Sequence, residues 1–386
     1  MLHQYFNTPE GGGPLRSYYL AKALVDAGIE TVVITTHNQS SKQIKSIEGI
    51  EVHYLPIPYD NRFGFFKRVT SFLKFVLSIV REAGQFRDAD ICYAISTPLT
   101  IGLAALWIKK RYHIPYYFEV GDLWPEAPVQ MGIIKNPILK AFLYKLEKSI
   151  YKQAYAIVAL SEAIKGDIER KISGKKIHVI PNIADTDFYA LEPKQPELEE
   201  KFSVKGKFVI SYIGTMGLAN GLEYLAYCAE ASRQLPVHFI LCGEGAVLEK
   251  LKQLTVQKTL QNISFVPVQN RDGVREVMNI TDAVMVSYKP LPVLETGSPN
   301  KYFDGLAAGK LMIVNVGGWM KQEVEQHKCG IAVNPLNPGD FVEKIAPFVD
   351  NTNQVEAYQA AARGLAEMMY SRSILSEKFL KLLRDD

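Results

Sequence analysis

The chain has 386 residues, of which 47% are hydrophobic and 22% charged, and its formal net charge is +3. This length suits two globular domains rather than one, and the composition excludes an intrinsically disordered chain. The four cysteines are widely separated and form no C-x-x-C pair, which argues against a zinc site or a disulfide framework and favours buried free thiols in a reducing cytosol.

The sequence shows no signal peptide and no run of 18 apolar residues, so we expect no membrane-spanning helix. Met1 to Phe6 has the pattern of the end of a first strand.

Short apolar runs alternate with helical patterns through both halves of the chain, which predicts parallel sheets covered by helices on both faces. In the first half the expected strands are Leu2–Phe6, Thr31–Thr35, Glu51–Leu55, Ile91–Ala94, Tyr116–Glu119, Ala156–Leu160 and Ile177–Ile180. In the second half they are Phe208–Ile213, His238–Cys242, Ile263–Val266, Ala283–Ser287 and Met312–Val316. A polar stretch, residues 183–206, separates the halves. We therefore predict an α/β protein with two Rossmann-like domains, residues 1–183 and 184–369, and a terminal helix within residues 370–386.

The first glycine-rich loop lies between the first strand and a helix that runs to about Asp26. Its glycines, Gly11, Gly12 and Gly13, would let backbone N–H groups approach a phosphate at the helix N-terminus. A dinucleotide site would also need an acidic residue at the tip of the second strand, and Thr35 to Asn38 contain none, which argues against NAD. The alternative is a tight turn without a ligand.

A basic and aromatic helix is expected over Asn61–Phe86. Residues 1–182 hold 23 Lys and Arg against 16 Asp and Glu, whereas residues 183–386 hold 21 against 25. The helix end between Arg62 and Arg68 therefore suits an anionic membrane surface, while packing of its apolar stripe on the first sheet is the alternative for the rest.

Asp122 follows a strand of the first half within the run Asp-Leu-Trp-Pro-Glu. Polar groups of open parallel sheets gather at the carboxyl ends of strands, so Asp122 is a candidate site residue, and capping of a helix is its alternative. The Asp-x-Asp pairs at Asp88 and Asp185 are better interpreted as turn acids than as metal ligands. No His or Cys cluster has metal spacing, and we expect no metal and no other cofactor.

Two glycine turns follow strands of the second half. Gly214, Thr215 and Gly217 belong to one turn, and the other contains a Gly-acid-Gly run. The members of that run are Gly243, Glu244 and Gly245. Both turns suit a nucleotide, and for the second a turn without a ligand is an equal alternative.

The most informative stretch runs from Ser298 to Lys310 and predicts a helix start, with Ser298 as N-cap and Pro299 in the first helical position. Asn300, Lys301 and Asp304 then share one helix face. A lysine in the first turn of a helix suits an anion, and a carboxylate one turn later suits sugar hydroxyls. Together they indicate a nucleotide with a diphosphate and a ribose, whereas an ordinary capped helix with a solvated lysine is the alternative.

This stretch, the two glycine loops and the Asp-Leu-Trp-Pro-Glu run occur in the order found in glycosyltransferase family 4, which the chain resembles over nearly its whole length. The Asp-Leu-Trp-Pro-Glu run is similar to that of the branch that makes bacterial surface polysaccharides such as O-antigen. The resemblance implies the GT-B fold, with a terminal helix that returns to the first domain.

The resemblance also implies roles for single residues. Asp304 would stand for the second glutamate of the family's acidic pair and hold the donor ribose, and Glu295 for the first, which contacts the donor sugar. The match departs from the family because eight residues, instead of seven, lie between Glu295 and Asp304. Leu218 and Asn220 occupy positions where many relatives carry an arginine and a lysine, so Lys301, backbone amides and Arg16 from the opposite domain would neutralise the diphosphate.

Many relatives have a histidine before the acid at Asp122, and this chain has Gly121, so no catalytic histidine is expected. The implied activity is that of a retaining, metal-independent glycosyltransferase of the hexosyltransferase type. It would use a nucleotide diphosphate sugar, with UDP-sugar expected, and a lipid-linked or saccharide acceptor. The protein would be cytoplasmic and peripheral at the inner membrane face, with no nucleic-acid partner. A sugar-nucleotide epimerase of the same fold and a non-catalytic subunit of a glycan-assembly complex remain alternatives.

Overall fold

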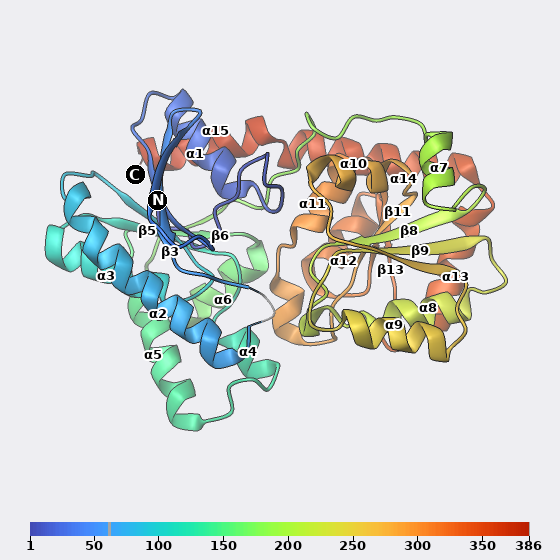
Figure 1. The fold of residues 1–386 in the computed structure, drawn as a ribbon, viewed down its shortest axis with the longest axis horizontal. Coiled ribbons are helices and arrows are strands. Elements are labelled where there is room, and N and C mark those ends of the chain that lie inside the picture. The colour runs from blue at the N-terminus through green and yellow to red at the C-terminus, as the bar shows by residue number, and fades with distance from the viewer. Residues whose placement is uncertain (61–62, 386) are drawn as a thin grey trace.

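A computed structural model describes residues 1–60 and 63–385 of the chain and shows two lobes with a parallel sheet in each (Figure 1). The lobe at the left of the view contains the first half of the chain, and the lobe at the right contains most of the second. This arrangement is the predicted α/β architecture of two Rossmann-like domains that face a cleft.

The C-terminal lobe is built on a six-stranded sheet in which every pairing is parallel. Its strand order is β10-β9-β8-β11-β12-β13, so the direction of winding reverses between β8 and β11. Ligands of open parallel sheets bind at such a switch point, outside the carboxyl ends of the strands. The strands are β8 (Phe208–Ile213), β9 (Val237–Cys242), β10 (Ile263–Val266), β11 (Ala283–Val286), β12 (Leu311–Val314) and β13 (Gly330–Ala332).

The N-terminal lobe holds two groups of strands, in the orders β1-β3-β2 and β4-β5-β6-β7. Leu2 bridges Ile34 of β1 and Ala94 of β4 and so joins the two groups, but the expected first strand over Leu2–Phe6 is reduced to this bridge. The strands are β1 (Val32–His37), β2 (Gln43–Ile47), β3 (Ile50–Pro56), β4 (Cys92–Ile95), β5 (Tyr116–Val120), β6 (Ile157–Ala159) and β7 (Ile177–Val179). The sequence did not predict β2 or β13.

Helices cover both faces of each sheet because the central strands are apolar on both sides. In the N-terminal lobe one hydrophobic cluster joins the sheet to four helices, and a second joins its other face to α1 and the last helix. The helices are α1 (Arg16–Asp26), α2 (Phe65–Glu82), η1 (Ala83–Phe86), α3 (Ile101–Tyr112), α4 (Glu126–Gln130), α5 (Pro137–Gln153) and α6 (Glu162–Lys171).

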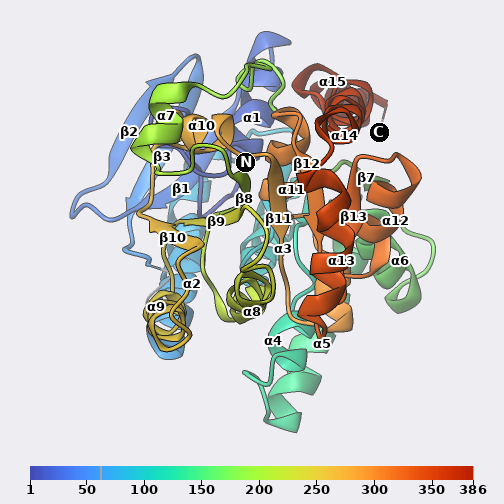
Figure 2. The same ribbon diagram turned by 90° about the vertical axis from the view of Figure 1, so that its right-hand side faces the viewer.

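In the C-terminal lobe α8, α9 and α13 cover one face of the sheet, and α11, α12 and α14 cover the other (Figure 2). The helices are α7 (Pro196–Lys201), η2 (Leu218–Asn220), α8 (Glu223–Ala231), α9 (Leu248–Gln257), α10 (Arg271–Asn279), η3 (Pro292–Thr296), α11 (Asn300–Ala307), α12 (Gly318–Gln326), α13 (Pro338–Val349) and α14 (Thr352–Leu365).

The last part of the chain crosses from one lobe to the other. A π-helical turn, η4 (Ala366–Tyr370), joins α14 to α15 (Arg372–Asp385), and α15 lies along the N-terminal lobe beside α1 (Figure 1). Leu375, Phe379 and Leu382 of α15 are buried in the same cluster as residues of α1. The C-terminal helix therefore completes the core of the lobe in which the chain begins.

Candidate functional site

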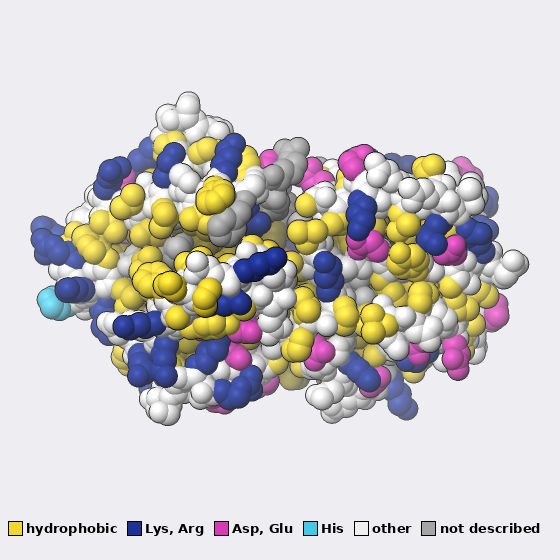
Figure 3. All heavy atoms as spheres, turned by 90° about the horizontal axis from the view of Figure 1, so that it is seen from below, with side chains coloured by type: hydrophobic (Ala, Val, Ile, Leu, Met, Phe, Trp, Pro, Cys, Tyr) yellow, Lys and Arg dark blue, Asp and Glu magenta, His cyan; other side chains and the backbone are white. Residues whose placement is uncertain are grey.

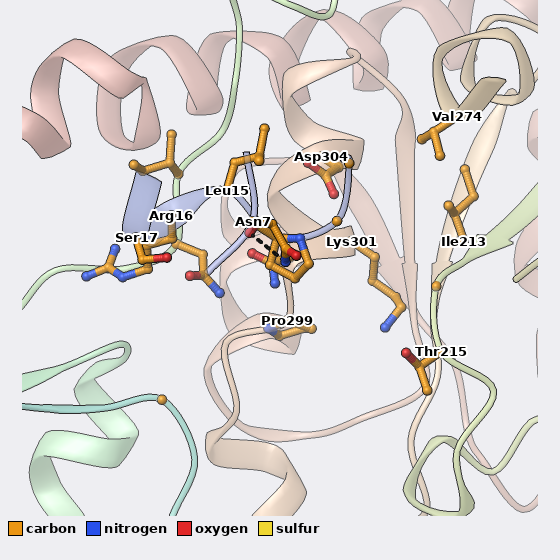
Figure 4. Close-up of a pocket in the computed structure, with 18 of the residues that line it drawn as sticks. Asn7, Leu15, Arg16, Ser17, Ile213, Thr215, Val274, Pro299, Lys301 and Asp304 are labelled. Atoms are coloured by element: carbon orange, nitrogen blue, oxygen red, sulfur yellow. Dashed lines mark hydrogen bonds between the residues drawn. The ribbon is translucent and has the colours of Figure 1, made fainter. Parts of the chain in front are cut away.

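A cleft of about 750 Å³ lies between the two lobes at the carboxyl ends of both sheets. Its walls include the first glycine loop and Asp122 from the N-terminal lobe, together with both glycine turns and the start of α11 from the C-terminal lobe. In Figure 4, Arg16 and Ser17 lie on one side of the cleft, and Lys301 and Thr215 lie on the other. The switch point between β8 and β11 thus opens into a space large enough for a small-molecule ligand.

The start of α11 carries the best-defined cation of the cleft. The Nζ atom of Lys301 lies 4.9 Å from the centre of the Tyr212 ring and 5.8 Å from that of Tyr288, so two aromatic rings hold it. Burial lowers the pKa of Lys301 to about 8, although the charge of Asp304 opposes this shift. A lysine with a depressed pKa at a helix N-terminus gains from an anion beside it.

The predicted cap of this helix is wrong, and the difference matters for the site. α11 begins at Asn300 with Pro299 as its N-cap, in an extended conformation, and within the described chain no side chain caps it. Ser298 lies one residue before the cap, and its buried Oγ has no hydrogen-bond partner among the described residues. A buried hydroxyl without a partner at the wall of a cleft is a ready contact for a polar ligand.

Asp304 lies one helical turn beyond Asn300, in the wall of the cleft. Burial and the nearby charge of Asp185 raise its pKa to about 7, while Arg271 and Lys301 act in the opposite direction. Near neutral pH this carboxyl group therefore exchanges between the protonated and the ionised form. A ligand hydroxyl that donates a hydrogen bond to it would favour the ionised form.

The two glycine turns of the C-terminal lobe lie back to back. The Gly214 N–H donates to Cys242 O at 2.9 Å and the Met216 N–H to Glu244 O at 2.7 Å. Gly243 has a φ of +142°, and a Cβ on it would lie 2.1 Å from the Gly214 carbonyl oxygen, so only glycine fits there. Gly214, Thr215 and the Gly-acid-Gly run line the cleft. Gly217 is not among the described lining residues, and its N–H donates to Asn220 Oδ1 at 3.0 Å.

The glycine loop of the N-terminal lobe also reaches the cleft and meets the opposite lobe. Gly12 has a φ of +69°, and a Cβ on it would lie 3.5 Å from the Arg271 backbone nitrogen at the start of α10. Arg16, expected to face the diphosphate, is instead 7% exposed and forms two hydrogen bonds of 3.0 Å with Glu119. It also donates to Pro181 O. Its charge is therefore balanced within the N-terminal lobe.

Asp122 lies at the carboxyl end of β5 and is exposed to the solvent that fills the cleft. The two lobes nevertheless enclose it, and this desolvation raises its pKa despite a hydrogen bond from Thr97. Its charge also acts on Tyr288 of the opposite lobe, which adds to the effect of burial in raising the pKa of that tyrosine. Asp122 therefore faces the wall that the C-terminal lobe contributes to the cleft.

Glu295, assigned to the donor sugar by resemblance, does not lie in the described wall of the cleft. Its carboxylate lies against the turn that starts α12, where a Cβ on Gly317 would be 2.9 Å from Glu295 Oε1. A carboxylate is favourable at the N-terminus of a helix. Glu295 therefore lies beside the start of α12. Of the two acids, Asp304 is the one that lines the described cleft.

Sequence reasoning missed a cluster that joins the lobes. Arg271 of α10 forms an ion pair with Asp185 and donates to the Tyr19 hydroxyl at 2.9 Å, and its guanidinium lies 3.7 Å from the centre of the Phe188 ring. Asp185 also accepts from the Phe188 N–H at 3.3 Å, so it closes a turn as expected. The residues are far apart in the chain, and no local pattern links them.

His3 is a second residue of the cleft wall that the sequence analysis did not single out. Its Nδ1 lies 2.8 Å from Ser17 Oγ, and burial lowers its pKa to about 4, so the imidazole is neutral near pH 7. Across the described ranges no group of three or more His, Cys, Asp or Glu is arranged to hold a metal ion. None of the helices described here combines the length and apolarity needed to cross a membrane.

Comparisons with known proteins assign the chain to a family. The model of Glycosyltransferase Family 4 matches residues 11–188, and that of Glycosyl transferases group 1 matches residues 194–365. The putative colanic acid biosynthesis glycosyl transferase WcaI of Escherichia coli is 24% identical over 56% of this chain and 54% of its own length. The α-D-kanosaminyltransferase of Streptomyces kanamyceticus is 19% identical over 95% of this chain and 99% of its own.

Among solved structures, that of the Anabaena protein HepE in complex with UDP and glucose has a TM-score of 0.74. It is 16% identical to this chain and covers 99% of it and 98% of HepE. These matches favour the glycosyltransferase over the epimerase and the non-catalytic subunit. With two family models that together match most of both lobes, the chain belongs to the family 4 glycosyltransferases of the GT-B fold and is an enzyme of the hexosyltransferase type.

Proposed function

We propose that this enzyme transfers a sugar from a UDP-sugar to a lipid-linked or saccharide acceptor in the synthesis of a bacterial surface polysaccharide. The bond between the anomeric carbon and the diphosphate breaks, a bond to an acceptor hydroxyl forms, and the configuration is retained, as family membership implies. The observation that carries the proposal is the start of α11. There, Lys301, the unpartnered Ser298 hydroxyl and Asp304 meet at the switch point of the sheet.

The start of α11 suits a nucleoside diphosphate in three ways. Lys301 offers a positive charge in the first helical turn, which no described side chain caps. Ser298 offers a hydroxyl, and Asp304 accepts from the ribose hydroxyls. We propose that these groups stabilise the leaving diphosphate without a metal ion, which makes the contribution of the protein mainly electrostatic.

Asp122 lies on the acceptor side of the cleft. Its enclosed carboxylate is suited to accept a hydrogen bond from an acceptor hydroxyl or from the donor sugar. Closure of the lobes would exclude water and bring this carboxylate toward the donor. We propose these roles for Asp122, and we propose no catalytic role for a histidine.

The acceptor side of the molecule also supports contact with a membrane. Apolar side chains are exposed on α2 (Phe66, Leu73 and Leu77) and on the first turns of α5 (Ile138, Leu139 and Phe142). Figure 3 shows hydrophobic side chains among Lys and Arg on this lobe. Arg62, part of the expected basic end of α2, lies outside the described residues. We propose that the N-terminal lobe binds the anionic inner face of the cell membrane, where a lipid-linked acceptor would lie.

Calorimetry with uridine, UDP and UDP-sugars tests the proposed donor site. Asp304→Asn should weaken binding of all three ligands, whereas Lys301→Ala should weaken UDP and UDP-sugars much more than uridine. A charge-assisted hydrogen bond contributes about 1.5–3 kcal/mol, which corresponds to about a 10- to 150-fold change in affinity. Unchanged affinities in folded variants would mean that the start of α11 is an ordinary helix start that does not bind the nucleotide. A thermal-shift panel of UDP-, GDP- and dTDP-sugars would identify the base and the sugar.

A further inference from the structure

The chain between β11 and α11 leaves its own lobe and packs in the other one. Val293 in η3 is 5% exposed and belongs to the hydrophobic cluster of the N-terminal lobe, against which Leu291 and Leu294 also pack. We call residues 291–296 the strap. The strap leads within two residues to Ser298 and within five to Lys301 of α11, so the turn that enters the donor-site helix is anchored in the opposite lobe.

Two polar contacts fix the strap to the N-terminal lobe. The Val293 N–H donates to Gln130 Oε1 of α4 at 3.1 Å, and the Ser161 hydroxyl donates to Thr296 O at 2.6 Å. Ser161 is 4% exposed and also caps α6, where its oxygen accepts from the Ile164 N–H. Each end of the strap is thus bonded to a different helix of the N-terminal lobe.

The amide of Gln130 is itself held in place. Its Nε2 donates to Glu126 Oε1 at 2.7 Å, and the Tyr144 hydroxyl of α5 donates to Glu126 Oε2 at 2.5 Å. This chain of hydrogen bonds fixes which side of the amide faces the strap. An acceptor held by two further side chains loses little freedom when it binds, which favours a defined position for Val293.

The residues after the strap are held by the C-terminal lobe and by the segment between the lobes. The Trp319 Nε1–H of α12 donates to Gly297 O at 2.9 Å, and the Asn182 amide donates to Ser298 O. A displacement of the lobes therefore pulls on the carbonyl groups on either side of the Ser298 turn. The helix beyond is buried through Tyr302 and Phe303 in the C-terminal lobe and has its own anchor.

We propose that the strap positions the diphosphate-binding turn from the N-terminal lobe, and that Gln130 and Ser161 are positioning residues for the donor diphosphate. This inference rests on the proposed function. Neither residue needs to touch the donor, because they act through the backbone of residues 293–298. Binding of the diphosphate and closure of the lobes are then coupled, since one segment takes part in both.

The test is calorimetry of Gln130→Ala and Ser161→Gly with UDP and with uridine. Both variants should bind UDP about tenfold more weakly, the effect of one lost hydrogen bond, and bind uridine within about twofold of the wild type. The difference arises because the variants loosen Ser298 and the start of α11, whereas Asp304 lies one turn further along the buried helix. Ser161→Thr keeps the hydroxyl and should restore UDP binding, and glycine at an N-cap costs only a few tenths of a kcal/mol in helix stability.

Gln153→Ala is the matched control, because the side chain that it removes is exposed on α5 and donates to Ser149 Oγ of the same helix. It should leave both affinities unchanged. Equal UDP binding by the wild type and the folded strap variants would overturn the inference, as would an equal loss for UDP and uridine. If the wild type itself bound neither UDP nor uridine, the proposed donor site would fail first.

Discussion

The affinity for a donor should depend on pH in a way that the two charged residues of α11 define. The carboxyl group of Asp304, with a pKa of about 7, accepts through both oxygens from the ribose only when it is ionised, and the amine of Lys301, with a pKa of about 8, carries the charge that meets the diphosphate only when it is protonated. About six-tenths of the free enzyme holds both charges at pH 7.5, and about one-tenth does so at pH 6 or pH 9. The affinity for UDP-glucose should therefore peak near pH 7.5 and fall about sixfold on either side.

Calorimetry across this range with three variants would identify the residue behind each limb. Asp304→Asn should abolish the fall on the acid side, and Lys301→Met the fall on the alkaline side. Lys310→Met is a matched control, because burial also lowers the pKa of Lys310 to about 8, yet this residue lies beyond the other end of α11 and outside the cleft. Titration of the ligand itself affects the wild type and the three variants equally, so it does not account for a difference between them. A flat profile in the folded wild type, or limbs that persist in the variants, would refute this account.

Four further outcomes follow from the structure. The pKa of Asp304 is raised from 3.8 to about 7, so its stabilising contribution is complete below pH 4 and is lost as the pH rises through 7. Asp304→Asn should therefore raise the stability at pH 8 by about 2 kcal/mol in denaturant titrations, roughly half of the full shift because the group is partly open to solvent, and should leave it unchanged at pH 4. Arg16→Met leaves the carboxylate of Glu119 buried without its cation and should cost about 3–5 kcal/mol of unfolding free energy, and a loss below 1 kcal/mol would contradict the buried pair. Excess chelator should not change donor binding or transfer, and loss of either would contradict the proposal of metal independence. Sedimentation with anionic vesicles should be salt-sensitive and should weaken in Phe142→Ser, whereas equal binding to neutral vesicles would contradict an electrostatic membrane contact.

The sequence predicted the buried strands because their apolar runs are continuous, as expected for sheets covered on both faces. It did not predict β2, which is antiparallel and has an exposed centre, so its side chains carry no hydrophobic pattern. It also missed β13, which has only three residues and begins with a glycine. Short edge strands are set by pairing with a neighbour rather than by their own composition, and that information is not local.

The same distinction applies to the site. Lys301 and Asp304 were placed together correctly because a helical repeat of three residues fixes their relation. The partners of Arg16 and Arg271 were not predictable, since Glu119 is 103 residues from the first and Asp185 is 86 residues from the second. Ser298 was misplaced because Pro299 adopts an extended conformation and becomes the cap itself.

The charges of the cleft favour Lys301 as the residue that would meet the proposed donor diphosphate. Three basic residues lie in the described wall, and two of them, Arg16 and Arg271, are already paired with carboxylates. These two pairs hold α1 against β5 and join the two lobes, so they shape the cleft rather than neutralise a ligand. Lys301 forms no ion pair with any residue that the structure describes, and burial disfavours its charge. A bound diphosphate would stabilise that charge and return the pKa of Lys301 toward its ordinary value. The free enzyme thus keeps a cation that burial destabilises. A donor bound as proposed would remove this destabilisation, and the gain would add to donor affinity only when the phosphates are present.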